Sequence, residues 1–120
     1  MKYRVPIVKV AALVAAGLLA GCATDVYEGQ YSFRDGWRRG KVVKVVNGAN
    51  LERPGYWECT RRMTQAERLA SDFAVVSYRG VSRQSTYAVP LMAGTRLQPE
   101  DKVYINLNTC HSPVRAAPAG

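Results

Sequence analysis

The sequence has few of the residues on which most enzyme chemistry depends. It contains one histidine, His111, and its three cysteines form no Cys-x-x-Cys motif, so it offers neither a histidine–acid pair nor a metal-ligand spacing. It also lacks a Gly-x-Ser-x-Gly nucleophile motif and a phosphate-binding glycine loop. The only adjacent acids, Glu100 and Asp101, follow a proline in a predicted turn. We therefore expect a protein that is not an enzyme and that binds no metal and no cofactor.

The sequence also has no apolar run long enough to cross a membrane. Its uncharged apolar stretch, residues 10–20, is eleven residues long, whereas a spanning helix needs roughly 20. The stretch follows a basic start that carries Lys2, Arg4 and Lys9 without an acid, and it leads into small residues. These three zones together indicate an export signal.

The signal ends in the tetrapeptide Leu19-Ala20-Gly21-Cys22, which resembles the lipobox of bacterial lipoproteins. The resemblance implies that residues 1–21 are a cleaved signal peptide. It also implies that Cys22 carries a diacylglyceryl group and that its amino group is usually acylated, for example with palmitate. The membrane is then a partner through this N-terminal lipid, because two or more acyl chains hold a protein stably. The alternative is an ordinary secreted protein in which a cysteine happens to follow Gly21.

The residue after Cys22 bears on the choice of membrane. In the enterobacterial lipoproteins that this terminus resembles, an aspartate next to the lipidated cysteine retains the protein at the inner membrane. Here that residue is Ala23. The resemblance therefore implies the cell outer membrane, with the domain in the periplasm or exposed at the cell surface.

Lipidation of Cys22 would leave an even pair of cysteines, Cys59 and Cys110. An exported protein lies in an oxidising compartment, where such a pair typically forms a disulfide. The alternative, a reactive or metal-binding thiol pair, is disfavoured because no Cys-x-x-Cys motif is present. We predict a Cys59–Cys110 disulfide that stabilises a small domain.

Positive charge dominates the sequence. It has 17 lysines and arginines against 9 acids, and removal of Lys2, Arg4 and Lys9 leaves 14 against 9. Export excludes cytoplasmic nucleic acid as a partner, so the excess predicts contact with anionic lipid or lipopolysaccharide. The candidate contact residues are close in sequence: Arg34, Arg38, Arg39, Lys41 and Lys44.

Two other interpretations of these cations remain open. They can serve solubility, or they can protect an exposed edge strand from aggregation. A regular strand starting near Gly40 would also point Lys41 and Lys44 to different faces, which argues against a single basic stripe on that strand.

Residues 22–39 combine the lipidated terminus with an aromatic and basic tether. Its large rings are Tyr27, Tyr31, Phe33 and Trp37. They either meet the membrane interface or pack on the core of the domain around a turn at residues 35–36. Core packing is favoured because a small domain needs its few large aromatic side chains inside.

Residues 40–111 are predicted to form a small β domain with one helix. A β-branched run at 41–46 ends at Asn47-Gly48, a pair suited to a type I′ hairpin turn, and residues 50–53 are the expected return strand. Residues 56–59 are expected to be extended. Thr64 and Glu67 match a capping box, which predicts a short helix over residues 64–71.

Three more strands complete the expected domain. Residues 73–79 and 82–89 pair around Gly80, and the first of these strands is expected to be central and largely buried. Residues 102–108 alternate in polarity, which predicts one inward and one outward face. The inward set is Val103, Ile105 and Leu107, and the outward set is Tyr104, Asn106 and Asn108. Residues 112–120 are expected to be a disordered tail.

Five or six short strands with one helix predict a mainly β fold, a small antiparallel barrel or sandwich of the OB or SH3-like kind. No motif in the mature domain matches a named family. The leading hypothesis is a lipid-anchored cell-envelope lipoprotein with a non-catalytic binding or structural β domain and an envelope protein as a further partner.

Two alternative functions are open. One is a periplasmic inhibitor of a hydrolase such as lysozyme, although a basic domain is poorly suited to a cationic cleft. The other is an accessory subunit of a secretion or envelope-assembly machine, which the sequence does not separate from the leading hypothesis.

Overall fold

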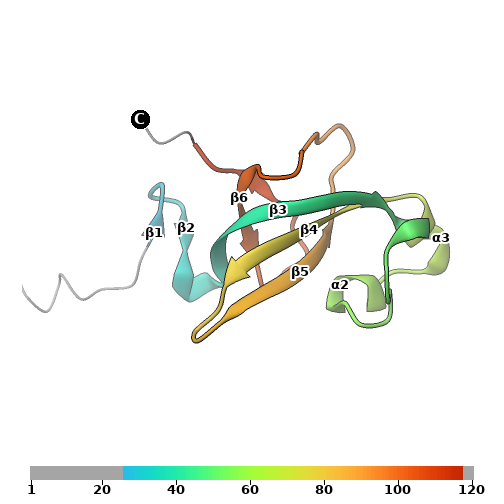
Figure 1. The fold of residues 1–120 in the computed structure, drawn as a ribbon, viewed down its shortest axis with the longest axis horizontal. Coiled ribbons are helices and arrows are strands. Elements are labelled where there is room, and N and C mark those ends of the chain that lie inside the picture. Colours follow the sequence, from blue (N-terminus) through green and yellow to red (C-terminus); the bar gives the residue numbers. More distant parts are fainter. Residues whose placement is uncertain (1–25, 118–120) are drawn as a thin grey trace, which may run out of the picture.

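The computed structural model describes residues 26–117, which form an open antiparallel sheet of five strands beside a small two-stranded sheet (Figure 1). The strand order of the large sheet is β5-β4-β3-β6-β7. Its strands are β3 (Trp37–Asn47), β4 (Asp72–Arg79), β5 (Gln84–Pro90), β6 (Lys102–Asn106) and β7 (Val114–Arg115). The small sheet pairs β1 (Val26–Tyr27) with β2 (Tyr31–Ser32). The helices are the 3-10 helices η1 (Phe33–Asp35) and η2 (Gly48–Asn50) and the α-helices α2 (Glu58–Arg61) and α3 (Gln65–Leu69).

The mainly β fold predicted from the sequence is confirmed, but its closure into a barrel is not. In the described residues, β5 and β7 are the two edges of the large sheet and are not paired with each other. The predicted signal peptide, residues 1–21, and the predicted lipidation site, Cys22, lie outside the described residues.

Strand β3 is the centre of the sheet and pairs antiparallel with β4 and β6. Gly40 permits close packing against β4, because a Cβ at this position would lie 2.8 Å from the Ser77 carbonyl oxygen. The register with β4 shifts between Val42 and Lys44, so Val43 is the extra residue of a β-bulge.

The bulge decides which way the two lysines of β3 point. Lys41 lies opposite Ser77 and Lys44 opposite Val75, two positions on the same face of β4. The prediction that Lys41 and Lys44 point to different faces is therefore wrong. It assumed an uninterrupted strand, and one inserted residue reverses the alternation.

The Asn47-Gly48 pair does not form the predicted hairpin turn. The Asn47 side chain instead accepts a hydrogen bond from the Ala49 backbone N–H (3.0 Å) and caps η2. Gly48 packs directly against the Arg68 carbonyl, where a Cβ would clash. Residues 50–53 are not a strand, and β3 pairs with β4 instead. A local cap and the apolar β4 together outcompete the short polar return strand.

The helical segment after η2 corrects one prediction and confirms another. Residues 56–59 are not extended, since α2 begins at Glu58 and the Thr60 hydroxyl donates to the Trp57 carbonyl (2.8 Å). The predicted helix over 64–71 is present as α3. Its capping box is complete, because Thr64 N–H donates to the Glu67 carboxylate and Glu67 N–H donates to the Thr64 hydroxyl, both at 3.1 Å.

The two faces of the sheet carry separate hydrophobic clusters. One consists of Val42, Cys59, Ala74, Val76, Val89, Leu97, Val103 and Ile105. The other consists of Leu51, Phe73, Val75 and Ala88, with Val46, Trp57 and Met63 packed against it. Strand β4 contributes to both clusters, as expected for a strand buried on both faces.

The outward face predicted for β6 is only partly correct. Tyr104 and Asn106 were expected outward, yet they are 2% and 5% exposed. The rings of Tyr27 and Tyr31 stack on Tyr104 at 5.3 and 5.0 Å between centroids. Asn106 donates from its Nδ2 to the Asp35 carbonyl (3.1 Å). The prediction from alternating polarity was wrong for this part of the face because the β1–β2 sheet covers it.

The C-terminal segment is more ordered than predicted. Residues 112–120 were expected to be a disordered tail, and residues 118–120 of it lie outside the described residues. In the described part, Val114–Arg115 form β7 and pair with Tyr104 and Val103 of β6. The Ala116 N–H also donates to the Lys102 carbonyl (2.9 Å). The proline-rich composition hid a two-residue strand that β6 holds in place.

Candidate anion-binding face

Four ion pairs engage acidic side chains of the described residues with basic partners. They join Lys41 to Glu100 (3.1 Å), Lys44 to Glu52 (3.9 Å), Arg62 to Glu58 (2.8 Å) and Arg115 to Asp101 (3.2 Å). Residues 26–117 contain no group of three or more His, Cys, Asp or Glu side chains placed to hold a metal ion. These acids have roles in surface pairing.

The single histidine has a structural environment. His111 donates from Nδ1 to the Ser112 carbonyl (2.6 Å), and its ring packs edge-on against Trp37 at 5.7 Å. Both contacts lie beside Cys110, so the imidazole packs near the disulfide.

The structure separates the five cations that the sequence grouped as one contact site. Arg38 lies on one face of β3, where its guanidinium covers the Phe33 ring at 3.5 Å and donates to the Phe33 carbonyl (2.9 Å). Arg39 and Lys41 lie on the opposite face, next to Tyr104 and Lys102 of β6. Lys44 shares their face but lies nearer the far end of the sheet, paired with Glu52. Arg34 belongs to η1, outside the sheet.

Two cations that the sequence did not single out complete a compact set. Lys102 is directly opposite Lys41 across the β3–β6 pair. Arg79 shares a face of β4 with Ser77, which is opposite Lys41 across the β3–β4 pair. We call Arg39, Lys41, Arg79 and Lys102 the cationic face. A shallow depression of about 270 Å³ lies on it, and Ser77 and Gln84 also line that depression.

The cationic face places like charges side by side. Directly opposed like charges in neighbouring strands destabilise a sheet. The Lys41–Lys102 pair is such a case, and Glu100 offsets it from one side by pairing with Lys41. All four side chains of the cationic face are exposed. An anion in the depression would relieve the remaining repulsion and accept hydrogen bonds from lysine and arginine.

Arg39 lies near two tyrosine rings. Its guanidinium lies 5.5 Å from the centre of the Tyr27 ring and 6.0 Å from that of Tyr104. A hydrogen bond with the Tyr104 side chain raises the pKa of Arg39. These contacts with Tyr27 and Tyr104 favour a guanidinium position beside the depression.

A second depression, of about 530 Å³, meets the cationic face at Arg39 and Lys102. It differs in charge because Glu28 and Asp101 also line it. The Ala117 backbone N–H donates to the Glu28 carboxylate (3.0 Å), and this bond is the main cause that lowers the pKa of Glu28. An ionised Glu28 favours anion binding on the cationic face over binding in this mixed-charge depression.

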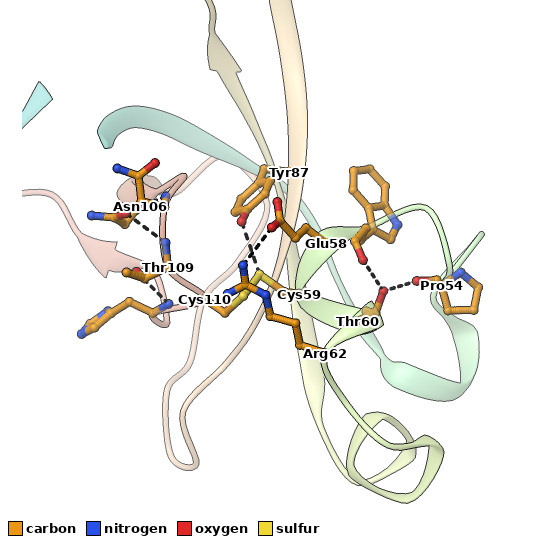
Figure 2. The surroundings of a disulfide bond; sticks show 12 residues. Pro54, Glu58, Cys59, Thr60, Arg62, Tyr87, Asn106, Thr109 and Cys110 are labelled. Atoms are coloured by element: carbon orange, nitrogen blue, oxygen red, sulfur yellow. Dashed lines mark hydrogen bonds and ion pairs between the residues drawn. A yellow bond between two sulfur atoms is a disulfide. The ribbon is translucent and has the colours of Figure 1, made fainter. Parts of the chain in front are cut away.

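The predicted cysteine pair is joined in the structure (Figure 2). The disulfide links Cys59 of α2 to Cys110, which follows β6, with Cα atoms 5.6 Å apart. Cys59 is 1% exposed and its sulfur lies 3.3 Å from the Tyr87 hydroxyl. Burial raises the pKa of Tyr87. The two cysteines are 51 residues apart in sequence. Closing a loop of this length lowers the entropy of the unfolded chain, which is worth about 4 kcal/mol of stability in the chain-entropy model.

The bridge stands among polar groups that are also hydrogen-bonded. Figure 2 shows Glu58 and Arg62 paired on one side of Cys59 and Thr60 bonded to the Pro54 carbonyl on the other. Asn106 accepts from the Thr109 backbone N–H (3.2 Å). The surroundings are those of a structural disulfide that fixes α2 against the C-terminal segment.

No protein-family model, curated protein or solved structure matches the chain. Within residues 26–117, no helix is both long enough and apolar enough to span a membrane. The arrangement of side chains on the sheet is therefore the basis for assigning a function.

Proposed function

We propose that the protein is a lipid-anchored cell-envelope lipoprotein whose β domain binds anionic groups without catalysis. The observation that carries the binding role is the cationic face, four exposed cations gathered from three neighbouring strands around one depression. Such a cluster reduces the stability of the free protein and is explained by an anionic ligand.

The lipobox-like tetrapeptide Leu19-Ala20-Gly21-Cys22 supports the anchor. The Cys59–Cys110 disulfide suits an oxidising compartment such as the periplasm. A lipid tether would confine the domain to the membrane plane and raise its effective concentration near envelope components. The cationic face would then need only modest intrinsic affinity.

The ligand chemistry follows from the donors. Arginine offers a planar fork that matches phosphate and carboxylate, and lysine adds a point charge. In an envelope, groups of this kind occur on lipid headgroups and on lipopolysaccharide. We propose the phosphates of lipopolysaccharide as the ligand of the cationic face, at the outer membrane.

The anchor is tested on the full chain expressed in a bacterial envelope. Wild type should incorporate radioactive palmitate and fractionate with membranes, and Cys22→Ser should do neither. Labelling that persists in Cys22→Ser would refute lipidation at Cys22.

Ligand binding is tested on residues 22–120 carrying Cys22→Ser, which include every described residue. Arg79→Gln/Lys102→Gln should weaken binding to purified lipopolysaccharide by about 10- to 30-fold, because each cation near an anionic surface contributes about fivefold. The matched control Arg61→Gln/Arg62→Gln removes the same charge from α2 and its C-cap, whose Cys59 packs in the cluster on the other face of the sheet, and should cost less than about threefold. Equal losses in the two double variants would refute the cationic face as the binding site.

A further inference from the structure

The turn between β4 and β5 exposes an apolar side chain between two arginines. The Gly80 N–H donates to the Arg83 carbonyl (2.7 Å), which closes the turn after Arg79. Val81 is 101% exposed, more than any other large apolar side chain in residues 26–117. We call residues 79–83 the hairpin tip. A single exposed valine is ordinary on a protein surface, so its place between two arginines is the feature that distinguishes this turn.

The hairpin tip lies at a strongly basic end of the sheet. The pairing of Gly40 with Tyr78 and of Trp37 with Asn106 places the start of β3 beside the ends of β4 and β6. Figure 1 shows this end, with β1, β2 and the β4–β5 turn, opposite the end that carries α2 and α3.

The charges of the described residues differ between the two ends. The hairpin-tip end has Arg34, Arg38, Arg39, Arg79 and Arg83 against the acids Glu28 and Asp35. The opposite end has Lys44, Arg61, Arg62 and Arg68 against Glu58, Glu67 and Asp72. The net charge is therefore +3 at the first end and +1 at the second, which gives the hairpin-tip end the stronger attraction for an anionic surface.

The N-terminal side of the described chain leaves from the same end. Val26 pairs with Ser32, and Ser32 caps η1, which leads directly into β3 at Trp37. Four chain steps separate Val26 from Cys22, a reach of roughly 14 Å at most. If Cys22 is lipidated, as the proposed function holds, the hairpin-tip end is the end held closest to the bilayer.

We infer that the hairpin tip is a membrane-docking element, with Val81 inserted at the interface of an anionic phospholipid bilayer and Arg79 and Arg83 on its headgroup phosphates. In this arrangement the apolar side chain contacts the acyl chains while the neighbouring arginines contact the anionic headgroups. This second attachment would orient the lipid-anchored domain, leaving α2 and α3 directed away from the bilayer. The inference rests on the proposed anchor for its geometry, but its test does not use the anchor.

The test is co-sedimentation of residues 22–120, carrying Cys22→Ser, with vesicles of phosphatidylethanolamine and phosphatidylglycerol. The unsubstituted domain should bind these vesicles and should bind phosphatidylcholine vesicles much more weakly. Val81→Asp should weaken binding about tenfold, and Arg83→Gln about fivefold. The matched control is Val43→Asp, which places the same charge on another exposed valine, one in the β3 bulge. It should change binding less than about twofold, because it lies away from the tip.

Equal effects of Val81→Asp and Val43→Asp would overturn the inference, as would failure of the unsubstituted domain to bind anionic vesicles. A protein partner at the hairpin tip would give the same negative vesicle result, together with a crosslink from position 81 to that protein in intact envelopes. The proposed function is tested separately, by palmitate labelling of Cys22 and by lipopolysaccharide binding to the cationic face. A negative result in either of those experiments would count against the proposed function and not against the hairpin tip. The two surfaces share Arg79, but Val81→Asp leaves Arg39, Lys41 and Lys102 unchanged and is expected to retain most lipopolysaccharide binding.

Discussion

Among single residues, Lys102 best illustrates the balance between stability and binding. It faces Lys41 directly across two strands, while Glu100 pairs with Lys41 alone. In the free protein this arrangement costs stability, and in a complex it provides two donors to one anion.

Lys102→Gln should therefore stabilise the free domain while weakening its binding to lipopolysaccharide. The gain should be a few tenths of a kcal/mol, because both lysines are exposed, and it should shrink as salt screens the repulsion. Thermal unfolding at low and high ionic strength measures it, with Arg61→Gln as the control that should show no such gain. A lower melting temperature of Lys102→Gln at low salt would contradict this account.

Individual site residues were predictable only where the prediction did not depend on which strands pair. The Cys59–Cys110 disulfide was predicted because two cysteines remain after Cys22 and an exported protein lies in an oxidising compartment, and the structure contains it. That Lys41 and Lys44 lie on the same face was missed because no local sequence pattern indicates the extra residue of the bulge at Val43. Arg79 and Lys102 were missed because their proximity arises from the pairing of strands that are distant in sequence.

At the scale of elements, α3 is the part most directly encoded by local sequence. It has five residues, too few to be stable as an isolated helix, and depends on its capping box and on the packing around it. The hydrogen bonds from Thr64, led by its backbone N–H, lower the pKa of Glu67 from its ordinary value of 4.5. A lowered pKa means that this contribution to stability is present above pH 4.5 and is lost as the pH falls through the folded-state value.

Thr64→Ala should destabilise the domain by about 1 kcal/mol, the usual cost of removing an N-cap side chain. The pKa of Glu67 should also move back toward 4.5, so that the loss of stability below pH 4.5 becomes less steep than in wild type. A carboxyl NMR titration of Glu67 and urea unfolding as a function of pH measure both effects. An unchanged Glu67 pKa in Thr64→Ala would show that the Thr64 side chain does not contribute to holding the carboxylate.

Elements that depend on competition between partners were harder to predict. Asn47-Gly48 suits a hairpin turn, yet the Asn47 side chain caps η2 and β3 takes β4 as its neighbour. Burial of Phe73, Ala74, Val75 and Val76 on two faces outweighs the local turn preference. β7 was missed for a related reason, since two residues make a strand only when an existing edge such as β6 pairs with them.

At the scale of the whole molecule, the chain forms an open sheet whose ends differ in charge and in covering. One end carries α2 and α3, and the other carries the β1–β2 sheet, the hairpin tip and the larger net positive charge (Figure 1). The cationic face lies between them on one side of the sheet. The sequence could predict the β class and the basic excess, but the segregation of charge required the strand order.

Segregation of charge and apolar exposure at one end gives the proposed envelope protein an orientation. The N-terminal lipid and the hairpin tip would hold one end against the bilayer, and the cationic face would meet anionic groups presented close to that surface. The hydrolase-inhibitor and assembly-subunit hypotheses, by contrast, do not require the hairpin-tip end to contact a membrane.

The most direct test of the central claim is an NMR titration of residues 22–120, carrying Cys22→Ser, with pyrophosphate. This small dianionic-to-tetraanionic probe has no acyl chain, so it reports anion binding alone. The account predicts that the largest amide shifts cluster at Arg39, Lys41, Arg79 and Lys102, and that they diminish as salt is raised. Shifts spread evenly over the arginines of α2 and α3, or no saturable shifts on the cationic face, would contradict it.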